Sequence, residues 1–504
     1  MTKNPLTPMD EISKADWKTT PESVKQLVRS LGSRIEQLEQ QYKELKAENE
    51  RLAEQVKQNS KNSSKPPSQD VNKGFKAKEK KPKGKPRGAQ FGHVGHERKL
   101  YPVEQCQQVE EHYPATCIEC GARLQGADHD PYRVQSVDIP PVVPVVNEHR
   151  FHALTCKQCG VTTRAWDEEI INGSGYGERV VAHVGVLSGQ YRQSHRMVQE
   201  LLGELFGIEL SVGSINQLRQ ESSSSVAEAV AQAHAYVQAQ PQVNLDETSF
   251  AQGNGDGQNP TGRQGWLWVM VTPLVSYFAV VLSRSGSVAQ RLLGQGFDGI
   301  VGSDRFSGYN WLELNGRQLC WAHLKRDFTR IAERTGVSGE LGRALLEQQR
   351  LLFEQWYRVR DGTLSRTEFL TEIALIQKQV RRLLCEGAGY DIAPHEKTPL
   401  AHTVRTCQQL LKVEPALWTF VTTVGVEPTN NAAERALRPA VLWRKNSFGS
   451  QSEAGSMFVA RMLTVVTTLH SQNRQVLEYL VEACRAARRG KPAPSLLPAD
   501  NYTP

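Results

Sequence analysis

The sequence predicts a multidomain α+β protein with an N-terminal coiled coil, a zinc ribbon, a helical region and an α/β core interrupted by a helical insertion. Three observations predict it. The chain has 504 residues, too many for one ordinary core, so two or more domains are expected. A leucine heptad precedes two Cys-x-x-Cys pairs. From residue 241, short apolar runs alternate with helical patterns, which is typical of a mixed sheet covered by helices.

Composition narrows the class of protein further. Net charge is +7, with 39% hydrophobic and 23% charged residues. A mildly basic globular chain with local basic clusters favours a polyanionic partner, most often nucleic acid. No run reaches the about 18 to 20 apolar residues that span a bilayer, and the N-terminus has no signal-peptide core. We therefore expect a cytoplasmic protein without membrane contact, whose cysteines are metal ligands or buried thiols rather than disulfides.

Residues 1–60 predict an oligomerisation helix that resembles a leucine zipper. One seam of the heptad is formed by Leu31, Leu38, Leu45 and Leu52, and the other by Val28, Ile35, Tyr42, Asn49 and Val56. Two seams with charged flanks are typical of a coiled coil, and a seam asparagine favours a defined register. Self-association into a homo-oligomer is the favoured interpretation. The alternative is an amphipathic helix packed on its own domain.

Residues 61–99 predict a flexible linker, because Pro and Gly interrupt any helix there. Between residues 73 and 87 it carries Lys73, Lys76, Lys78, Lys80, Lys81, Lys83, Lys85 and Arg87 against a single acid, Glu79. Such a segment releases counterions from DNA phosphates without reading sequence. The alternative is a tether that only adds solubility.

Residues 100–170 predict a zinc-binding domain. Its four candidate ligands are Cys117, Cys120, Cys156 and Cys159. Each Cys-x-x-Cys turn presents two thiolates, and two such turns complete a tetrahedral structural zinc site. The runs "YRVQSVDIP" and "VVPVVNEHRFHALTC" between the pairs are expected to be strands of the ribbon. Four reduced thiols without metal are the alternative.

Residues 171–240 predict helices only. The segment "HRMVQELLGELFGIELSVGSINQLRQ" has an apolar helix, a turn near Gly207, a cap at Ser211 or Ser214, and a second helix. This is helix-turn-helix-like spacing, which favours DNA binding. A plain helical bundle has the same spacing and remains the alternative.

The core is expected in two parts, 241–326 and 426–488, around a helical insertion at 327–425 and before a tail at 489–504. The runs "QVNLDETSF", "GWLWVMVTP" and "SYFAVVLSRS" predict three antiparallel strands. A helix ("SVAQRLLGQG"), a strand ("GIVGSD") and a fifth candidate strand ("QLCWAH") follow. Residues 455–488 predict one long amphipathic helix.

Three carboxylates are candidates for chemistry. Asp246 lies in the first strand, Asp304 ends the run "GIVGSD", and Glu434 opens a helix after the possible caps Asn430 and Asn431. Such a cluster repels itself unless hard cations such as Mg²⁺ or Mn²⁺ neutralise it, and two ions can serve a phosphoryl displacement. Each acid has a solvated surface charge as its alternative. Adjacent strand residues face opposite ways, so the pattern does not choose between Asp246 and its neighbour Glu247.

Several motifs together carry a family resemblance. "VNLDETSF", "GSDRFSGYNW", "CWAHLKRDF" and "NNAAERALRPAVLWRKNSFG" resemble, in order, the blocks of the insertion-sequence family numbered sixty-six, which are bacterial DDE transposases with an RNase H-like core. "NSSKPPSQD", the paired Cys-x-x-Cys motifs and "LLP" are similar to its linker, zinc domain and C-terminal element. The resemblance implies the triad Asp246, Asp304 and Glu434. It also implies two Mg²⁺ or Mn²⁺ ions, a nucleoid location, accessory proteins, and double-stranded DNA partners, namely the element's terminal inverted repeats and target DNA.

Other residues are expected to support this site. Arg435, Arg438, Arg444 and Lys445 follow Glu434 and are predicted to contact DNA phosphates. Cys320 and His323 match a Cys-x-x-His block beside such cores, with a structural or DNA-positioning role favoured over metal because two ligands do not complete a zinc site. The predicted function is metal-dependent cleavage at the element ends and strand transfer. The alternatives are an inactive DNA-binding regulator and a related metal-dependent nuclease.

Overall fold

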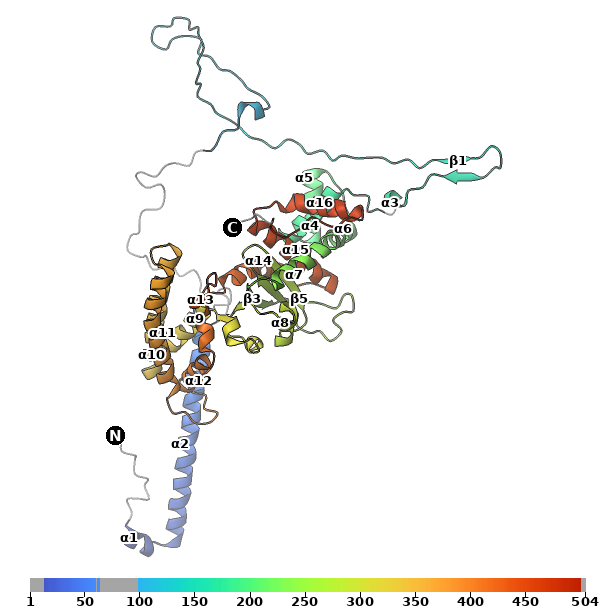
Figure 1. Cartoon of the computed structure of the whole chain (residues 1–504). Coiled ribbons are helices and arrows are strands. Elements are labelled where there is room, and N and C mark those ends of the chain that lie inside the picture. Colours follow the sequence, from blue (N-terminus) through green and yellow to red (C-terminus); the bar gives the residue numbers. More distant parts are fainter. Residues whose placement is uncertain (1–12, 60, 64–97, 172, 500–504) are drawn as a thin grey trace. The chain divides into compact units, whose positions relative to one another are not determined.

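The computed structural model describes residues 13–59, 61–63, 98–171 and 173–499. The basic residues 73–87 of the predicted linker lie outside the described part. Two compact units are present, and each is described by itself. The described part of the smaller unit is residues 98–149 and 202–208, and the larger unit contains the rest. The larger unit is a mixture of helices and one main sheet, coloured by sequence in Figure 1.

The heptad segment is one continuous helix. After the short α1 (Lys14–Thr19), helix α2 covers Glu22–Lys57. Along it Leu31, Leu38 and Leu45 are 51%, 57% and 70% exposed. The C-terminal end of α2 is joined to a later part of the same unit, where Glu54 pairs with Arg334 at 2.7 Å. The leucine side chains of the heptad are thus largely exposed to solvent in the described part of the chain, and self-association stays a prediction.

The cysteine-rich segment has less strand structure than predicted. It contains η2 (Val103–Gln105), β1 (Ala153–Thr155), β2 (Thr162–Arg164) and α3 (Glu168–Ile171). Strands β1 and β2 pair, antiparallel, around the second cysteine turn, and a single antiparallel bridge between Thr116 and Arg123 flanks the first. Residues 132–152 of the two runs expected to be strands form no strand, and only the end of the second run does, as β1. That part of the prediction was wrong, because β propensity forms a strand only where a partner strand is available.

The helical segment before the core is confirmed. Its helices are α4 (Glu178–Gly189), α5 (His195–Phe206), α6 (Val212–Ser225) and α7 (Ala227–Gln238). Gly207 has φ 63°, the left-handed conformation that suits glycine at a helix end. Ser211 caps α6 by accepting the N–H of Ser214 at 3.0 Å. The turn and the cap therefore fall where the sequence predicted them.

The main sheet has five strands in the order β5-β4-β3-β6-β7. They are β3 (Gln242–Ser249), β4 (Trp266–Val271), β5 (Ser276–Val281), β6 (Ile300–Ser303) and β7 (Arg317–Leu319). The first three form the predicted antiparallel meander, and β6 and β7 continue the sheet in parallel with β3. The predicted helix between β5 and β6 is α8 (Gly286–Leu293). The fifth strand is shorter than "QLCWAH", because Cys320 already begins the next helix.

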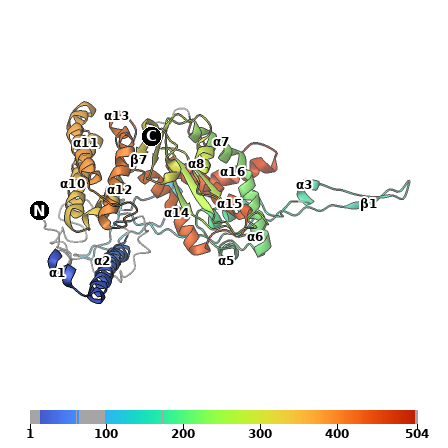
Figure 2. The same cartoon turned by 90° about the horizontal axis from the view of Figure 1, so that it is seen from below.

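Helices fill the stretch between β7 and Glu434, as predicted. They are α9 (Trp321–Ala332), α10 (Gly336–Arg360), α11 (Arg366–Ala388), α12 (Pro399–Lys412) and α13 (Thr419–Thr422), with η5 (Glu414–Leu417) as a short turn. Two other short turns, η3 (Ser307–Tyr309) and η4 (Leu314–Gly316), lie earlier, between β6 and β7. Helices α10, α11 and α12 lie side by side in Figures 1 and 2. They enclose a second apolar core around Trp356 and Phe369, separate from the core beneath the sheet.

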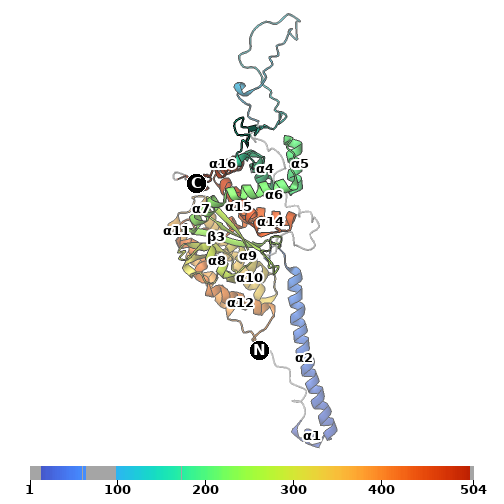
Figure 3. The same cartoon turned by 90° about the vertical axis from the view of Figure 1, so that its right-hand side faces the viewer.

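The last helices cover the sheet. Helix α14 (Asn431–Ser447) contacts β3 and β4, and α15 (Glu453–Ser471) contacts β5 (Figure 3). The predicted single helix over 455–488 is wrong, since α16 (Val476–Arg488) is separate from α15. Asn473 has φ 53°, which breaks the helix, and the neighbouring Gln472 donates to the carbonyls of Leu274 and Leu496. None of the described helices is both long and apolar enough to cross a membrane.

Candidate active site

Three elements carry the candidate carboxylates. Asp246 lies on β3, Asp304 follows the last residue of β6, and Glu434 lies in the first turn of α14. Strands β3 and β6 pair in parallel with Asn244 opposite Gly302, so extending that register by two residues sets Asp246 opposite Asp304. Gly302 permits this close pairing, because a Cβ there would lie 2.2 Å from the Asn244 side chain.

Asp246 is buried and lies within the electrostatic influence of the other two acids. Burial raises its pKa well above the usual range, and the charges of Glu247, Asp304 and Glu434 raise it further. One bond opposes this shift: the Glu247 N–H donates to Asp246 Oδ1 at 2.9 Å. Because like charges oppose ionisation at Asp246, a divalent cation among these acids would relieve the repulsion.

The neighbouring Glu247 is engaged elsewhere. Its side chain is 1% exposed and pairs with Arg284, whose Nε and Nη2 lie 2.8 and 2.7 Å from Oε1. The buried Tyr309 hydroxyl donates to the other oxygen, Oε2. Burial raises the pKa of Glu247, while these two partners act to lower it. Both oxygens of this carboxylate therefore have protein partners.

The position of Asp304 is fixed by hydrogen bonds to the backbone and side chain around it. The buried Arg317 donates to the Asp304 carbonyl at 2.8 Å and to the Ser303 hydroxyl at 3.2 Å. Burial lowers the pKa of Arg317 to about 10. The Asp304 carboxylate itself accepts the N–H of Phe306 at 2.8 Å. Among the described residues, none donates a hydrogen bond to the second carboxylate oxygen of Asp304.

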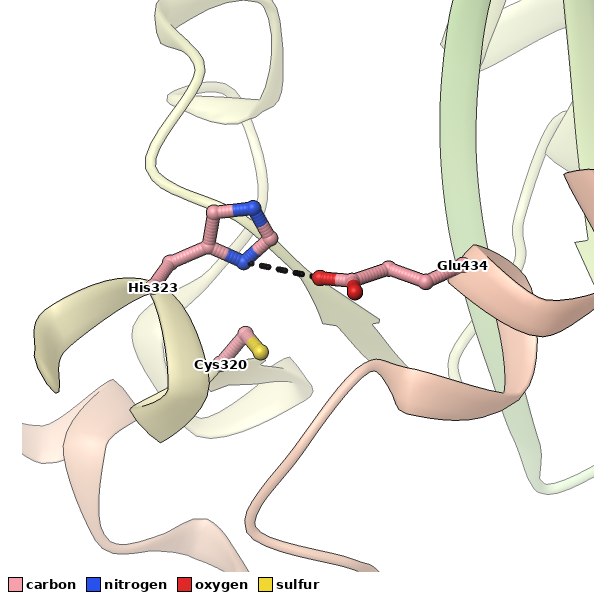
Figure 4. Close-up of side chains that lie close together, drawn as sticks. All are labelled: Cys320, His323 and Glu434. Carbon is pink, nitrogen blue, oxygen red and sulfur yellow. Dashed lines mark ion pairs between the residues drawn. The ribbon is translucent and has the colours of Figure 1, made fainter. Parts of the chain in front are cut away.

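Glu434 faces the Cys-x-x-His block of α9. Figure 4 shows His323 Nδ1 pointing toward Glu434 Oε1, 3.5 Å away, with Cys320 beneath them. Arg326 lies 3.7 Å from the other carboxylate oxygen. Ligand atoms of Cys320, His323 and Glu434 all lie within 4.8 Å of one another. Within the described residues, Glu434 Oε1 and His323 Nδ1 are buried without a hydrogen-bond partner.

Cys320 is better suited to a structural role than to metal binding. Its sulfur accepts the backbone N–H of Asn430 at 3.1 Å. Burial raises the pKa of this thiol to about 11, so deprotonating it for a metal costs more free energy than deprotonating an exposed thiol. A supporting role of Cys320 and His323 beside Glu434 and its helix stays a prediction.

The basic residues of α14 divide into two groups. Arg435, Arg438 and Lys445 are exposed at helical spacing. Arg444 is half-buried and donates to the Thr248 hydroxyl at 2.9 Å and to Ser249, and burial lowers its pKa. Helix α14 continues through Pro439, which therefore does not end it. Arg444 joins α14 to β3, and phosphate contact by all four residues stays a prediction.

The two cysteine turns have the same local geometry, each described within its own unit. The Cys117 N–H donates to Ala122 O at 2.8 Å, and the Cys156 N–H donates to Val161 O at 2.8 Å. Gly121 and Gly160 follow the second cysteine of each turn with φ of 71° and 72°. Backbone N–H groups lower the pKa of both Cys117 and Cys156. Each turn is thus preorganised to present thiolates, as a zinc knuckle is.

Two residues that matter for the site were not identified from the sequence. Arg317 directly precedes the candidate strand "QLCWAH", and its polar neighbours Asn315 and Gln318 give no sign that it is buried. Asn430 was expected to cap α14, but its side chain makes no capping bond and donates instead to Leu245 O at 2.9 Å. No local pattern indicates a bond to a strand that distant in the sequence.

Comparison with known proteins identifies the family. Residues 173–457 match the model of the Transposase IS66 family, which is more than half of the chain. Residues 114–160 match the zinc-finger binding domain of transposase IS66. Residues 17–99 match a family of unknown function.

Two similar proteins come from Sinorhizobium fredii. The uncharacterized protein y4qI is 25% identical over 452 residues, covering 82% of this chain and 77% of its own length. The uncharacterized protein y4hP is 23% identical over 396 residues, covering 70% and 67%. Neither name adds a function. The family match over the helical region, the sheet and α14, together with the zinc-finger match, is the basis for the assignment: the chain belongs to the IS66 family of transposases.

Proposed function

We propose that this transposase cleaves DNA at the ends of its element and joins them to target DNA by a DDE two-metal mechanism. The observation that supports it is the convergence of Asp246, Asp304 and Glu434 from two paired strands and one helix. The strand order and the mixed directions of the sheet also support an RNase H-like core for residues 241–326 and 426–488. The helices between these two parts are then the insertion.

The donor set fits a hard divalent cation. It offers carboxylate oxygens whose mutual repulsion raises the pKa of Asp246, and one of them, Glu434 Oε1, is buried without a hydrogen-bond partner among the described residues. Asp246, Asp304 and Glu434 would hold Mg²⁺ or Mn²⁺. Two such ions, when bound, stabilise the attacking and leaving oxygens of an in-line phosphoryl displacement.

The chain's own residues would place the DNA at this site. Arg435, Arg438 and Lys445 lie along one exposed face of the helix that carries Glu434, where phosphates can approach them. Helix α6 exposes Asn216 and Gln217 in its first turns. Amide side chains of this kind pair with adenine in the major groove. We therefore assign phosphate positioning to α14 and readout of the terminal repeats to the region of α5 and α6.

The remaining regions would organise the complex. The zinc-binding domain would help grip the terminal inverted repeats. The uncovered leucine seam of α2 would join copies of the chain into a homo-oligomer, so that two element ends are held together. Proteins encoded by the same element would complete the reaction where this chain alone does not.

The test uses the full chain with DNA carrying an element end, a second target DNA, and Mg²⁺. We expect a cut that frees a 3′-hydroxyl at the end, followed by joined products with the target. Cutting without joining would support the nuclease alternative instead. Tight binding to the ends without any metal-dependent cutting would support an inactive DNA-binding regulator.

A further inference from the structure

One buried asparagine connects the three elements that carry the carboxylates. Asn430 is 1% exposed and stands at the start of α14. Its side-chain amide donates to the carbonyl of Leu245 at 2.9 Å, and Leu245 precedes Asp246 on β3. Its own carbonyl accepts the N–H of Glu434 at 3.2 Å. Asn430 thus bonds directly to the strand of one acid and to the backbone of another.

The third acid is reached through Cys320. The Asn430 N–H donates to Cys320 Sγ at 3.1 Å. The N–H of Cys320 donates to the carbonyl of Ser303 at 2.9 Å, and Ser303 precedes Asp304. A second backbone hydrogen bond, from the Trp321 N–H to Pro428 O at 2.9 Å, joins the same two segments, the start of α9 and the residues just before α14.

These hydrogen bonds hold the three elements together against the electrostatic repulsion between their carboxylates. The charges of Asp304 and Glu434 both raise the pKa of Asp246, so the three groups repel one another when ionised. Glu434 is also separated from the two strands by the long run of helices from α9 to α13, which supplies no strand pairing to fix where α14 begins. The bonds of Asn430 and Cys320 supply that fixation at the backbone.

We propose that Asn430 and Cys320 form a positioning pair that sets the spacing of Asp246, Asp304 and Glu434 for divalent cations. The proposal rests on the metal-dependent function proposed above. Neither residue is a ligand in it. Each acts through the backbone next to an acid, as residues behind the ligands of metal sites do, where substitution typically weakens metal binding about 10- to 100-fold.

The experiment measures Mn²⁺ binding by the zinc-loaded full chain without DNA, by calorimetry and by the electron paramagnetic resonance of free Mn²⁺. We expect Asn430→Ala and Cys320→Ala each to weaken Mn²⁺ binding at least about tenfold. Cys320→Ser keeps a hydrogen-bond acceptor and should bind more tightly than Cys320→Ala. Asn431→Ala, on the exposed neighbour, should bind Mn²⁺ as the wild type does.

A second control separates positioning from general loss of stability. Gln318 is equally buried, but its side-chain amide donates to Leu319 O at 2.8 Å and Leu417 O at 3.2 Å and accepts the N–H of Phe420 at 2.8 Å, and none of these residues carries or adjoins an acid of the site. Gln318→Ala should lower the melting temperature while leaving Mn²⁺ affinity within about twofold. Wild-type affinity in both Asn430→Ala and Cys320→Ala would overturn the proposal. So would an affinity loss in Gln318→Ala as large as theirs.

The outcomes also distinguish this proposal from the proposed function. If the wild type binds no Mn²⁺, or if Asp246→Asn does not abolish the binding, the proposed metal site itself is wrong. If it does bind and Asn430→Ala binds equally, only the positioning pair is wrong. Should Asn430→Ala fail to fold, the comparison of Cys320→Ser with Cys320→Ala decides alone.

Discussion

Replacing Glu247 with glutamine should destabilise the protein and spare its metal site, whereas replacing the adjacent Asp246 with asparagine should do the reverse. Glu247 is the buried partner of Arg284 and Tyr309. Asp246 makes no ion pair within the described chain and is surrounded by other acids. The two substitutions therefore test which member of the "DE" pair faces the metal.

The magnitude for Glu247→Gln follows from its contacts. Hydrogen bonds to charged groups contribute about 1.5–3 kcal/mol each, roughly twice the value of neutral ones. Glutamine can still accept from Arg284 through its oxygen, but its NH2 group can only donate to the Tyr309 oxygen, and the negative charge is lost. Arg284 is 37% exposed, so solvent screens its charge and reduces the loss. Burial also penalises the ionised form of Glu247, which offsets part of the loss. The expected cost is about 1–2 kcal/mol, or a melting temperature lower by roughly 2–8 °C for a domain of this size.

Asp246→Asn should show the opposite sign, with a characteristic pH dependence. The folded pKa of Asp246 is raised by burial and by neighbouring acids. A raised carboxyl pKa contributes stability below the unfolded value of about 3.9 and loses it as pH rises through the folded value. Asparagine does not titrate. Without divalent metal, Asp246→Asn should therefore melt above the wild type at pH 8, and the difference should shrink toward pH 4.

The assay is thermal unfolding without metal, paired with a Mn²⁺ titration of each variant. Glu247→Gln should bind Mn²⁺ within about twofold of wild type at its lower melting temperature. The reasoning is refuted if Glu247→Gln loses Mn²⁺ binding with an unchanged melting temperature while Asp246→Asn still binds. In that case Glu247, not Asp246, would face the site.

Three further predictions concern the other regions. Cys117→Ser should release the structural zinc, measured as metal content after gel filtration, and an unchanged zinc content would contradict the knuckle assignment. Leu38→Asp should dissociate the oligomer in light scattering, because it places a charge in the uncovered seam of α2; an unchanged mass would assign self-association elsewhere. Arg438→Ala and Lys445→Ala should each reduce the salt dependence of DNA binding by about one phosphate contact, whereas the exposed Lys378→Ala on α11 should not.

The main sheet could be predicted because its strands carry local signals. The apolar runs around Asp246 and Trp268 are short and bounded by turn residues, so the meander follows from the sequence alone. The boundary between α15 and α16 could not be predicted. Asn473 adopts a left-handed conformation within the polar run "HSQNRQ", and the turn is stabilised by Gln472 bonds to Leu274 and Leu496, which are distant in the sequence.

The candidate site shows the same division. The residue types and the order of Asp246, Asp304 and Glu434 could be read from motifs. Which of Asp246 and Glu247 is available to the site has a physical explanation only in the structure, where Tyr309 and Arg284 donate hydrogen bonds to the Glu247 carboxylate. Contacts of this kind join strands and helices across the whole core, and no periodicity or spacing in the sequence records them.

The most direct test of the account is single-turnover cleavage of end-containing DNA in Mg²⁺ by the wild type and by Asp246→Asn, Asp304→Asn and Glu434→Gln. Glu427→Gln is the matched control, because Glu427 is an exposed acid shortly before α14. The account predicts that all three triad variants bind the DNA but do not cut it, while the control cuts at the wild-type rate. Cleavage at the wild-type rate by any one of the three would contradict the claim that these carboxylates form the catalytic site.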